Sequence, residues 1–423
     1  MTLTLAVIPL LLLFLGMPIF ALFIAGAAAT FAFFVSVPGV ALHQIMFGGL
    51  ENYAMRAVPF VIFAGELMGG SGIAERLIVW VLALLGRVPG GLGVATVGAC
   101  TLIGAISGAS TATVAVVGKS LYPGLLRDGY GKRFSAGLVS SSGSIDIVIP
   151  PSIAMILYGA SAEQSIPKLF AAGVLPGILI ALMMSVHVVF AALRMGVASG
   201  RKFDLRYFLR STWDAVPALF MPIFVLASIY LGLASPTEAG GFACLYAILV
   251  GRYVYRCMTW SEVLDCAVRS AILTSQILVI VAAAALFSWL LTVNGVPQAL
   301  TNWLQSLQLH QWSFLVCINI ILLIVGCFLD PTSAILVLTP LFLPLVKALG
   351  IDPIHFGIIM TVNVAIGMFT PPFGLNLFVA QTVLGVPLET LYRGVLPFAV
   401  TQILALIIIT YWPALSLFLA NAV

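Results

Sequence analysis

Charge is scarce in this sequence. Of its 423 residues, 8% are Asp, Glu, Lys or Arg and 62% are hydrophobic, whereas charged residues make up about 25% of a soluble domain. The scarcity excludes a soluble globular protein, and a net charge of +4 on so few basic residues does not indicate nucleic-acid binding. Apolar runs such as 170–193, 215–233, 271–293 and 395–418 exceed about 18 residues without strict alternation, so we predict an all-α polytopic membrane protein and not a β-barrel.

Catalytic and metal-binding patterns are absent from the sequence as well. The six Cys residues form no CxxC pair, and the four His residues form no HExxH or similar ligand spacing. A nucleophile motif such as GxSxG does not occur either. An intramembrane enzyme is therefore disfavoured, and we expect a protein that is not an enzyme and holds no resident cofactor.

The first 36 residues carry no charge. This run is too long for a cleavable signal peptide and lacks the basic start of one. We predict two spans that are joined at Gly16-Met17-Pro18.

The sequence contains an internal repeat. Residues 142–153 resemble residues 363–374, and both segments contain a Pro-Pro pair that interrupts a helix. Residues 104–111 correspond to residues 326–333, and both contain small polar side chains within an apolar stretch. Two apolar halves of this kind are typical of transporters that bind their cargo at mid-membrane.

We predict one repeat over residues 1–212 and a second over residues 213–423. Each would contain a re-entrant hairpin, whose arms are too short for a full crossing of about 20 residues, and a broken helix. Non-helical backbone at this depth is tolerated only where protein or a cavity surrounds it. The predicted ranges are about 91–118 (hairpin) and 134–160 (broken helix) in the first repeat, and about 312–346 (hairpin) and 356–384 (broken helix) in the second.

The basic residues predict the topology. Clusters at 127–133, 194–210 and 252–269 are placed in the cytoplasm by the positive-inside rule. Four full spans then separate the first broken helix from the second hairpin, so the two repeats are inverted and both termini lie outside. Residues 201–212 and 297–311 are amphipathic, with Trp at their edges, and we expect them to lie at the membrane interface.

The small polar clusters predict cation sites. A sodium ion is well served by neutral oxygens with at most one carboxylate, and a Pro-Pro break frees backbone groups that need partners. The alternative is that Ser, Thr and Gly simply allow close helix packing. The candidate sodium ligands are Ser107, Ser110, Thr111, Gly143 and Ser144 in the first repeat, and Asp330, Thr332, Ser333, Gly367 and Thr370 in the second.

The broken helices also predict a substrate site. The N-terminus of a half-helix carries partial positive charge and free amides, so a carboxylate needs no dedicated Arg. The candidate substrate-binding residues are Ser110, Asp146, Ser152, Asp330 and Asn376.

Acidic residues within membrane segments are functional candidates by default. Asp330 is the strongest, because it lies at a hairpin tip beside a proline. Asp146 is expected either to bind a cation or to accept hydrogen bonds from loose backbone. We predict structural roles for Glu66, as an interhelical link, and for Glu238, as an acid at a helix start.

At these motifs the chain resembles the large membrane subunit of tripartite ATP-independent periplasmic (TRAP) transporters. The resembling segments cover nearly the whole chain and include 106–115, 149–153, 236–240 and 326–378. The family's sodium and substrate region falls on Ser107, Ser110, Thr111, Ser144 to Ser152, Asp330 to Ser333 and Gly367 to Asn376. The sequence departs from the family pattern at Asp146, where a small or apolar residue is usual.

The resemblance implies a sodium-coupled importer of an organic acid in the bacterial inner membrane. It also implies an elevator mechanism with interleaved scaffold and transport domains. The expected partners are a small four-helix membrane subunit and a periplasmic binding protein, and the expected coupling ion is sodium. Sialic acid, C4-dicarboxylates and other sugar acids all remain candidate substrates.

Two other transport functions are alternatives. A stand-alone sodium/dicarboxylate or citrate-type symporter shares inverted hairpin repeats and would need no binding protein. A channel needs a continuous polar path, whereas the polar groups of this chain are concentrated at mid-depth.

Overall fold

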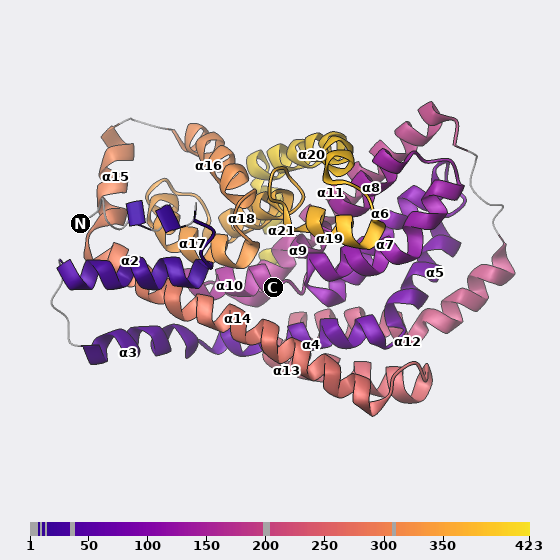
Figure 1. Cartoon of the computed structure of the whole chain (residues 1–423), viewed down its shortest axis with the longest axis horizontal. Helices are drawn as coiled ribbons and strands as arrows, with labels where there is room; N and C mark the ends of the chain where they lie inside the picture. Colours follow the sequence, from indigo (N-terminus) through magenta and orange to yellow (C-terminus); the bar gives the residue numbers. More distant parts are fainter. Residues whose placement is uncertain (1–6, 9–10, 13–14, 34–38, 198–203, 307–309) are drawn as a thin grey trace.

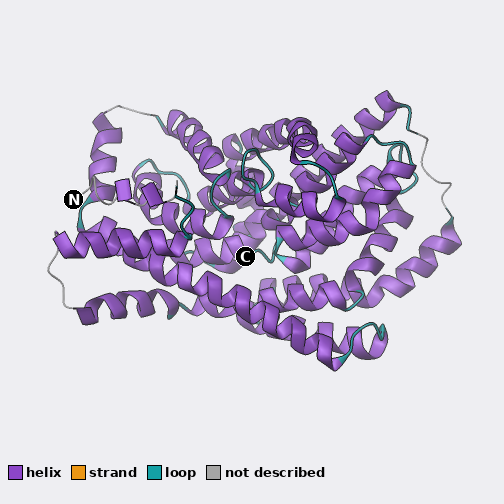
Figure 2. Ribbon diagram, viewed as in Figure 1, coloured by secondary structure: helices purple, strands orange, loops and turns teal. Residues whose placement is uncertain are grey.

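The computed structural model describes residues 7–8, 11–12, 15–33, 39–197, 204–306 and 310–423. Within these ranges every regular element is a helix (Figure 2). On length and apolar composition, six of the described helical segments suit a membrane crossing, or seven if one bent pair counts as a span. The predicted all-α polytopic class is therefore confirmed, whereas most of the expected first span lies outside the described residues.

The helices alternate between long spans and shorter broken pieces. In the first half they are α2 (Ile19–Phe33), α3 (Gly39–Leu50), η1 (Tyr53–Arg56), α4 (Ala57–Gly70), α5 (Ile73–Leu85), α6 (Gly91–Ser107), α7 (Ser110–Arg127), α8 (Lys132–Ser142), α9 (Ile145–Val148), α10 (Ile153–Ala162) and α11 (Ile166–Met195). In the second half they are α12 (Leu205–Tyr230), α13 (Pro236–Leu249), η2 (Val250–Val254), α14 (Trp260–Val293), α15 (Val296–Ser306), α16 (Gln311–Gly326), α17 (Pro331–Ala348), α18 (Pro353–Gly367), α19 (Leu375–Leu384), α20 (Leu388–Tyr411) and α21 (Pro413–Ala420).

The long helix α14 runs obliquely along one side of the molecule (Figure 1). It packs against α2, α3 and α4, while α13 packs on α4 and α12 on α5. We call these helices, α2–α5 and α12–α14, the outer layer. The remaining helices form a bundle, in which α20 packs on α8, α21 on α11 and α16 on α18. In Figure 1, α8, α16, α18 and α20 of this bundle lie above α3, α4, α13 and α14, whereas α2 and α5 lie at the height of the bundle. Each part thus combines segments from both halves of the chain.

Both predicted broken helices are present. The first runs through α8 and α9, stops before Pro150-Pro151 and resumes as α10; the second stops at the end of α18 and resumes as α19 beyond Pro371-Pro372. Proline has no N–H to donate and its ring clashes with the preceding turn, so neither helix continues through its pair. The residues around the first break are buried in protein, as expected at membrane depth, whereas Pro372, Phe373 and Leu375 at the second break are exposed.

The two predicted hairpins correspond to α6–α7 and α16–α17. Gly108, in the left-handed conformation with φ +60°, ends α6, and a cap at Asp330 starts α17. The arms have 17 and 18 residues in the first pair and 16 and 18 in the second, or about 24 to 27 Å at 1.5 Å per residue. The first hairpin was predicted too short, because α7 continues beyond Gly118 to Arg127.

Three other boundaries differ from the prediction. Residues 205–212 are not a separate interfacial helix, because Asp204 caps a helix that continues without interruption to Tyr230. The run 395–418 is not one helix, since Pro413 starts a new one. An unexpected bend of 69° separates α4 from α5, where Gly72 has φ +77°.

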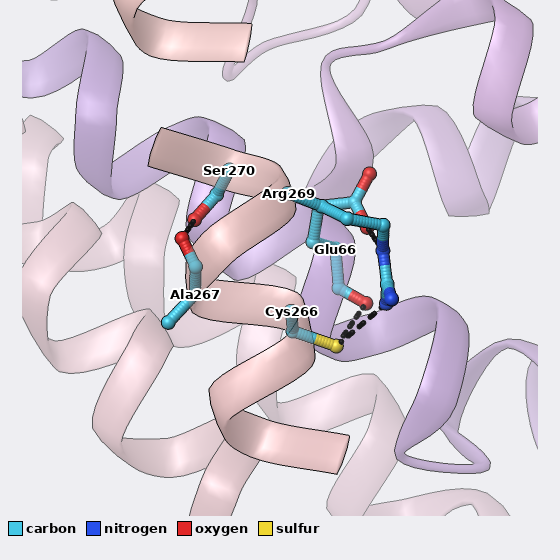
Figure 3. A network of polar contacts seen from close by, with 5 residues as sticks. All are labelled: Glu66, Cys266, Ala267, Arg269 and Ser270. Carbon is cyan, nitrogen blue, oxygen red and sulfur yellow. Dashed lines mark hydrogen bonds and ion pairs between the residues drawn. The ribbon is translucent and has the colours of Figure 1, made fainter. Parts of the chain in front are cut away.

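The acids predicted to be structural have the expected contacts. Glu66 on α4 accepts a hydrogen bond of 3.0 Å from Nε of Arg269 on α14, and the Cys266 thiol lies beside both groups (Figure 3). Glu238 and Ser235 form a capping box at the start of α13. Glu66 therefore joins two helices of the outer layer, and Glu238 stabilises a helix start.

Candidate functional site

The best-connected polar cluster links both halves of the chain. The Ser110 hydroxyl, at the start of α7, donates to the backbone oxygen of Gly143 at 2.8 Å. The side-chain amide of Asn376 on α19 donates to Ser110 Oγ at 2.8 Å and to the backbone oxygen of Ser140 at 3.2 Å. Ser110 and Asn376 are both buried. A hairpin tip, the first broken helix and the second broken helix thus meet at one point.

Helix packing explains why these segments meet. The arm α7 packs on α19, the resumed part of the second broken helix, and α10, the resumed part of the first, packs on α17. The other arm of each hairpin packs against the broken helix of its own half, because α6 packs on α8 and α9 and α16 packs on α18. Each hairpin thus contacts the broken helices of both halves. The halves interlock, so residues far apart in sequence share one site.

The second hairpin tip is organised by its own cap. Asp330 accepts a hydrogen bond from the backbone N–H of Ser333 at 3.2 Å and from the Ser333 hydroxyl at 2.5 Å. This is the side-chain capping expected of Asp before a helix. Asp330 is half-buried whereas Ser333 is fully buried, so the carboxylate lies at the edge of the packed tip.

Two close backbone contacts occur at matching places in the halves. A Cβ added to Gly104 would lie 2.6 Å from the Cα of Asp146, and one added to Gly326 would lie 3.3 Å from the Cα of Gly367. These four positions are the ones that the sequence repetition pairs, Gly104 with Gly326 and Asp146 with Gly367. The first arm of each hairpin thus contacts the broken helix of its own half just before the Pro-Pro break.

Several predicted ligands point elsewhere. The Ser144 hydroxyl donates to the backbone oxygen of Ser141 at 2.7 Å and to Oε1 of Gln402 at 3.0 Å. Ser152 caps α10, and its hydroxyl donates to the backbone oxygen of Ile147 at 2.5 Å. The Thr370 hydroxyl donates to the Ile366 oxygen of its own helix at 2.6 Å.

The other predicted ligands have less defined surroundings. The Ser107 hydroxyl is buried and has no hydrogen-bond partner in the described part of the chain. Thr111 and Thr332 are half-buried, each in the first turn of the second arm of its hairpin. Gly367 contributes backbone alone and is enclosed by Gly326.

Sequence reasoning missed a set of buried amides and their partners. Gln402 on α20 binds Ser144 and also donates to the Ser141 oxygen at 3.0 Å. Asn319, Asn363, Thr410 and His355 form a second buried network between α16, α18 and α20. Isolated amide side chains within apolar runs were the available signal, because polar groups in a membrane segment need partners.

The geometry suits a cation and an anion held by neutral groups. The cluster supplies hydroxyl, amide and carbonyl oxygens, and α10 and α19 each present a helix N-terminus beside it. Basic side chains in α6–α10 and α16–α19 occur at Lys119, an exposed residue in the middle of α7, at Arg127 and Lys347 in the last turn of a hairpin arm, and at Lys132 and Arg133 in the first turn of α8. A carboxylate bound near the breaks would therefore meet backbone amides and not a cationic side chain.

Comparisons with known proteins agree on one family. Residues 6–415 match the family model described as "Tripartite ATP-independent periplasmic transporter, DctM component". The C4-dicarboxylate TRAP transporter large permease protein DctM of Pseudomonas aeruginosa is 43% identical over 89% of this chain and 88% of that protein. The ectoine TRAP transporter large permease protein TeaC of Halomonas elongata is 35% identical over 97% and 96%, respectively. The 2,3-diketo-L-gulonate TRAP transporter large permease protein YiaN of Escherichia coli K12 is 34% identical over 95% and 94%.

A solved structure shares the fold. The YdaH transporter of Alcanivorax borkumensis, described as having an unusual topology, matches with a TM-score of 0.65 at 16% identity. The match covers 96% of this chain and 98% of that one. The arrangement of helices is thus one that a known membrane transporter also has.

Proposed function

The chain belongs to the family of the DctM component of tripartite ATP-independent periplasmic transporters, and we propose that it couples the inward movement of sodium to the import of an organic acid. Membership makes it a multispanning transporter permease that works with a small membrane subunit and a periplasmic binding protein. It also disfavours the stand-alone symporter. The ion, the mechanism, the inner-membrane location and the external termini are our proposals.

The contact of Asn376 with Ser110 carries the proposal. It brings a hairpin tip of one half against the broken helices of both halves, and all its groups are uncharged oxygens or amides. Buried polar groups of this kind are costly in a membrane unless they hold a ligand or each other. Sodium fits the oxygens of the hairpin tips. At the start of α19 the N–H groups of Asn376 and Leu377 already bind the backbone oxygens of Met368 and Gly374, and at the start of α10 the Ser152 side chain caps the N–H of Met155. A carboxylate would therefore bind the remaining first-turn N–H groups, chiefly those of Ile153 and Ala154.

The substrate class follows from the same chemistry. The three relatives described above are named for C4-dicarboxylates, ectoine and 2,3-diketo-L-gulonate, which all carry a carboxylate, whereas a further relative is named for isethionate, whose acid group is a sulfonate. Backbone amides recognise a carboxylate without reading the rest of the molecule. We therefore propose that this chain binds the acid group, and that the binding protein selects the compound.

We propose that the bundle moves against the outer layer as an elevator. The hairpins and broken helices all lie in the bundle, so a bound ion and substrate would move with it. The bundle meets the layer where α6 packs on α4 and α5 and where α17 packs on α14. One close backbone contact lies on α4, where a Cβ added to Gly65 would lie 2.7 Å from the backbone oxygen of Ser107. A glycine at this contact presents no side chain to the moving surface.

Reconstitution tests the proposal. Proteoliposomes that contain this chain and its small membrane subunit are supplied with the binding protein and a panel of radiolabelled organic acids. We expect uptake when an inward sodium gradient and the binding protein are both present. Equal uptake with potassium in place of sodium would contradict sodium coupling, and full uptake without the binding protein would favour the stand-alone symporter.

A further inference from the structure

Asp146 is a buried carboxylate with an incomplete set of partners. It lies in α9, immediately before the first Pro-Pro break, and its residue is fully buried. The Thr113 hydroxyl of α7 donates to one carboxylate oxygen, Oδ2. The other oxygen, Oδ1, is inaccessible to solvent and has no hydrogen-bond partner in the described part of the chain.

Within the part of the chain that the structure describes, no basic side chain forms an ion pair with this carboxylate. The helix α9 packs against α6, α7, α8, α10, α11 and α18. The contacts of Asp146 with these elements include the hydrogen bond from the Thr113 hydroxyl of α7 and the close approach of Gly104 of α6. Ion pairs occur elsewhere, for example between Arg269 and Glu66 and between Arg393 and Glu389. A buried carboxylate without a positive partner is strongly unfavourable.

The second half of the chain shows that the break itself does not need an acid. Its equivalent of Asp146 is Gly367, which makes the same close contact with a hairpin arm and precedes the same Pro-Pro break. The loose backbone at the second break is therefore accommodated without a carboxylate at this position. A purely structural role for Asp146, as an acceptor for local backbone, is disfavoured by this comparison.

Near the hairpin tip and the Pro-Pro break, each half has one carboxylate, and the two carboxylates lie on different elements. In the second half the acid is Asp330 at the hairpin tip, and the equivalent position in the first half is Gly108. In the first half the acid is Asp146 on the broken helix, and the equivalent in the second half is Gly367. Besides acids that cap the far ends of these helices, such as Asp128 of α7 and Asp352 of α18, each pair of hairpin and broken helix thus has one carboxylate, and one carboxylate matches the requirement of a monovalent cation.

We propose that the Asp146 carboxylate is a direct ligand of a monovalent cation held between α7 and α9. This inference rests on the proposed function and names the charged ligand of its first cation site. Oδ1 binds the cation while Thr113 fixes the orientation of the carboxylate through Oδ2. A proton would remove the charge but would leave Oδ1 without a partner, whereas a cation satisfies both requirements.

The cation binding is measured on the purified chain through its thermal unfolding at increasing sodium concentration, with choline keeping the ionic strength constant. A ligand that binds the folded state raises the unfolding temperature by mass action. In Asp146→Asn we expect the sodium concentration for half-maximal stabilisation to rise at least about tenfold, the ratio that corresponds to about 1.4 kcal/mol. Thr361→Val, which removes a fully buried hydroxyl bonded within α18, is the matched control and keeps the wild-type value.

If the asparagine side chain of Asp146→Asn disturbs folding, Asp146→Gly is a second variant. Glycine is chosen because Gly367 occupies the equivalent position in the other half of the chain. Wild-type sodium dependence in a folded variant of either kind overturns the inference. The uptake assay separates this result from the proposed function. If wild-type uptake is driven by sodium and the Asp146 variants keep the same sodium dependence, only the cation ligand is refuted; if wild-type uptake ignores sodium, both proposals fail.

Discussion

The side-chain amide of Asn376 lies 2.8 Å from the hydroxyl of Ser110, although 266 residues separate them in sequence. The bond joins the start of α19 to the start of α7. The Ser110 hydroxyl also donates to the backbone oxygen of Gly143. One hydroxyl therefore joins the first hairpin tip to both broken helices. A change on either side leaves buried polar groups without partners.

We predict that Asn376→Leu lowers uptake at least about 100-fold and destabilises the protein by about 1 to 3 kcal/mol, the cost of leaving a buried partner unsatisfied. Uptake in proteoliposomes and the midpoint of thermal unfolding are the measurements. Thr382→Val is the control, because this exposed hydroxyl on the same helix bonds only to the Phe378 oxygen. Equal effects of the two substitutions would contradict a role for the Asn376 contact.

The hairpin tips are tested by Asp330→Asn and Ser110→Ala. We expect each to reduce sodium-dependent uptake at least about tenfold while the protein still inserts, because each removes an oxygen that we assign to a cation site. Asn remains a good helix cap, so the loss in Asp330→Asn is not explained by helix stability. Unchanged uptake in both variants would remove the hairpin tips from the binding site.

Gly367→Ala tests the close contact between the second broken helix and its hairpin. An added Cβ would lie 2.6 Å from the Cα of Gly326, which is too close for any adjustment short of a backbone shift. We expect a loss of stability of about 1 to 3 kcal/mol from overpacking, together with lost uptake. Gly241→Ala is the control, because no atom lies within 4 Å of the added group there. A Gly367→Ala protein with normal unfolding would contradict the contact.

The sequence predicted the parts of this site better than their connections. The Pro-Pro breaks and the polar hairpin tips are local features, because proline and small polar residues act on their own turn of backbone. Ser110, Gly143 and Asn376 were all named in advance, but their mutual contact depends on how α7 crosses to α19. The partner of Ser144, Gln402, was not foreseen, since a single amide in an apolar run does not indicate which helix it faces.

The same limit applies to the fold. The capped start of α12 and the bend between α4 and α5 depend on Asp204 and Gly72. A hydropathy pattern is an average over many residues and does not register either one. The sequence therefore indicated a separate interfacial helix over residues 201–212 and gave no sign of the bend between α4 and α5. Matching contacts in the two halves, such as Gly104 with Asp146, were implied by the repetition but became visible only in the packed structure.

The contact between the outer layer and the bundle gives the last prediction. Gly65 lies against the backbone oxygen of Ser107, and one turn further along α4 Gly69 has open space around it. We expect Gly65→Ala to slow uptake at least about tenfold, because the added methyl group obstructs the point where the bundle slides on α4. Sodium-dependent stabilisation of the purified protein is measured alongside uptake, because the added methyl group also presses on Ser107, which is a candidate sodium ligand. Gly69→Ala, on the same helix, should transport normally, and a Gly65→Ala protein with wild-type uptake would show that the bundle does not move across this contact.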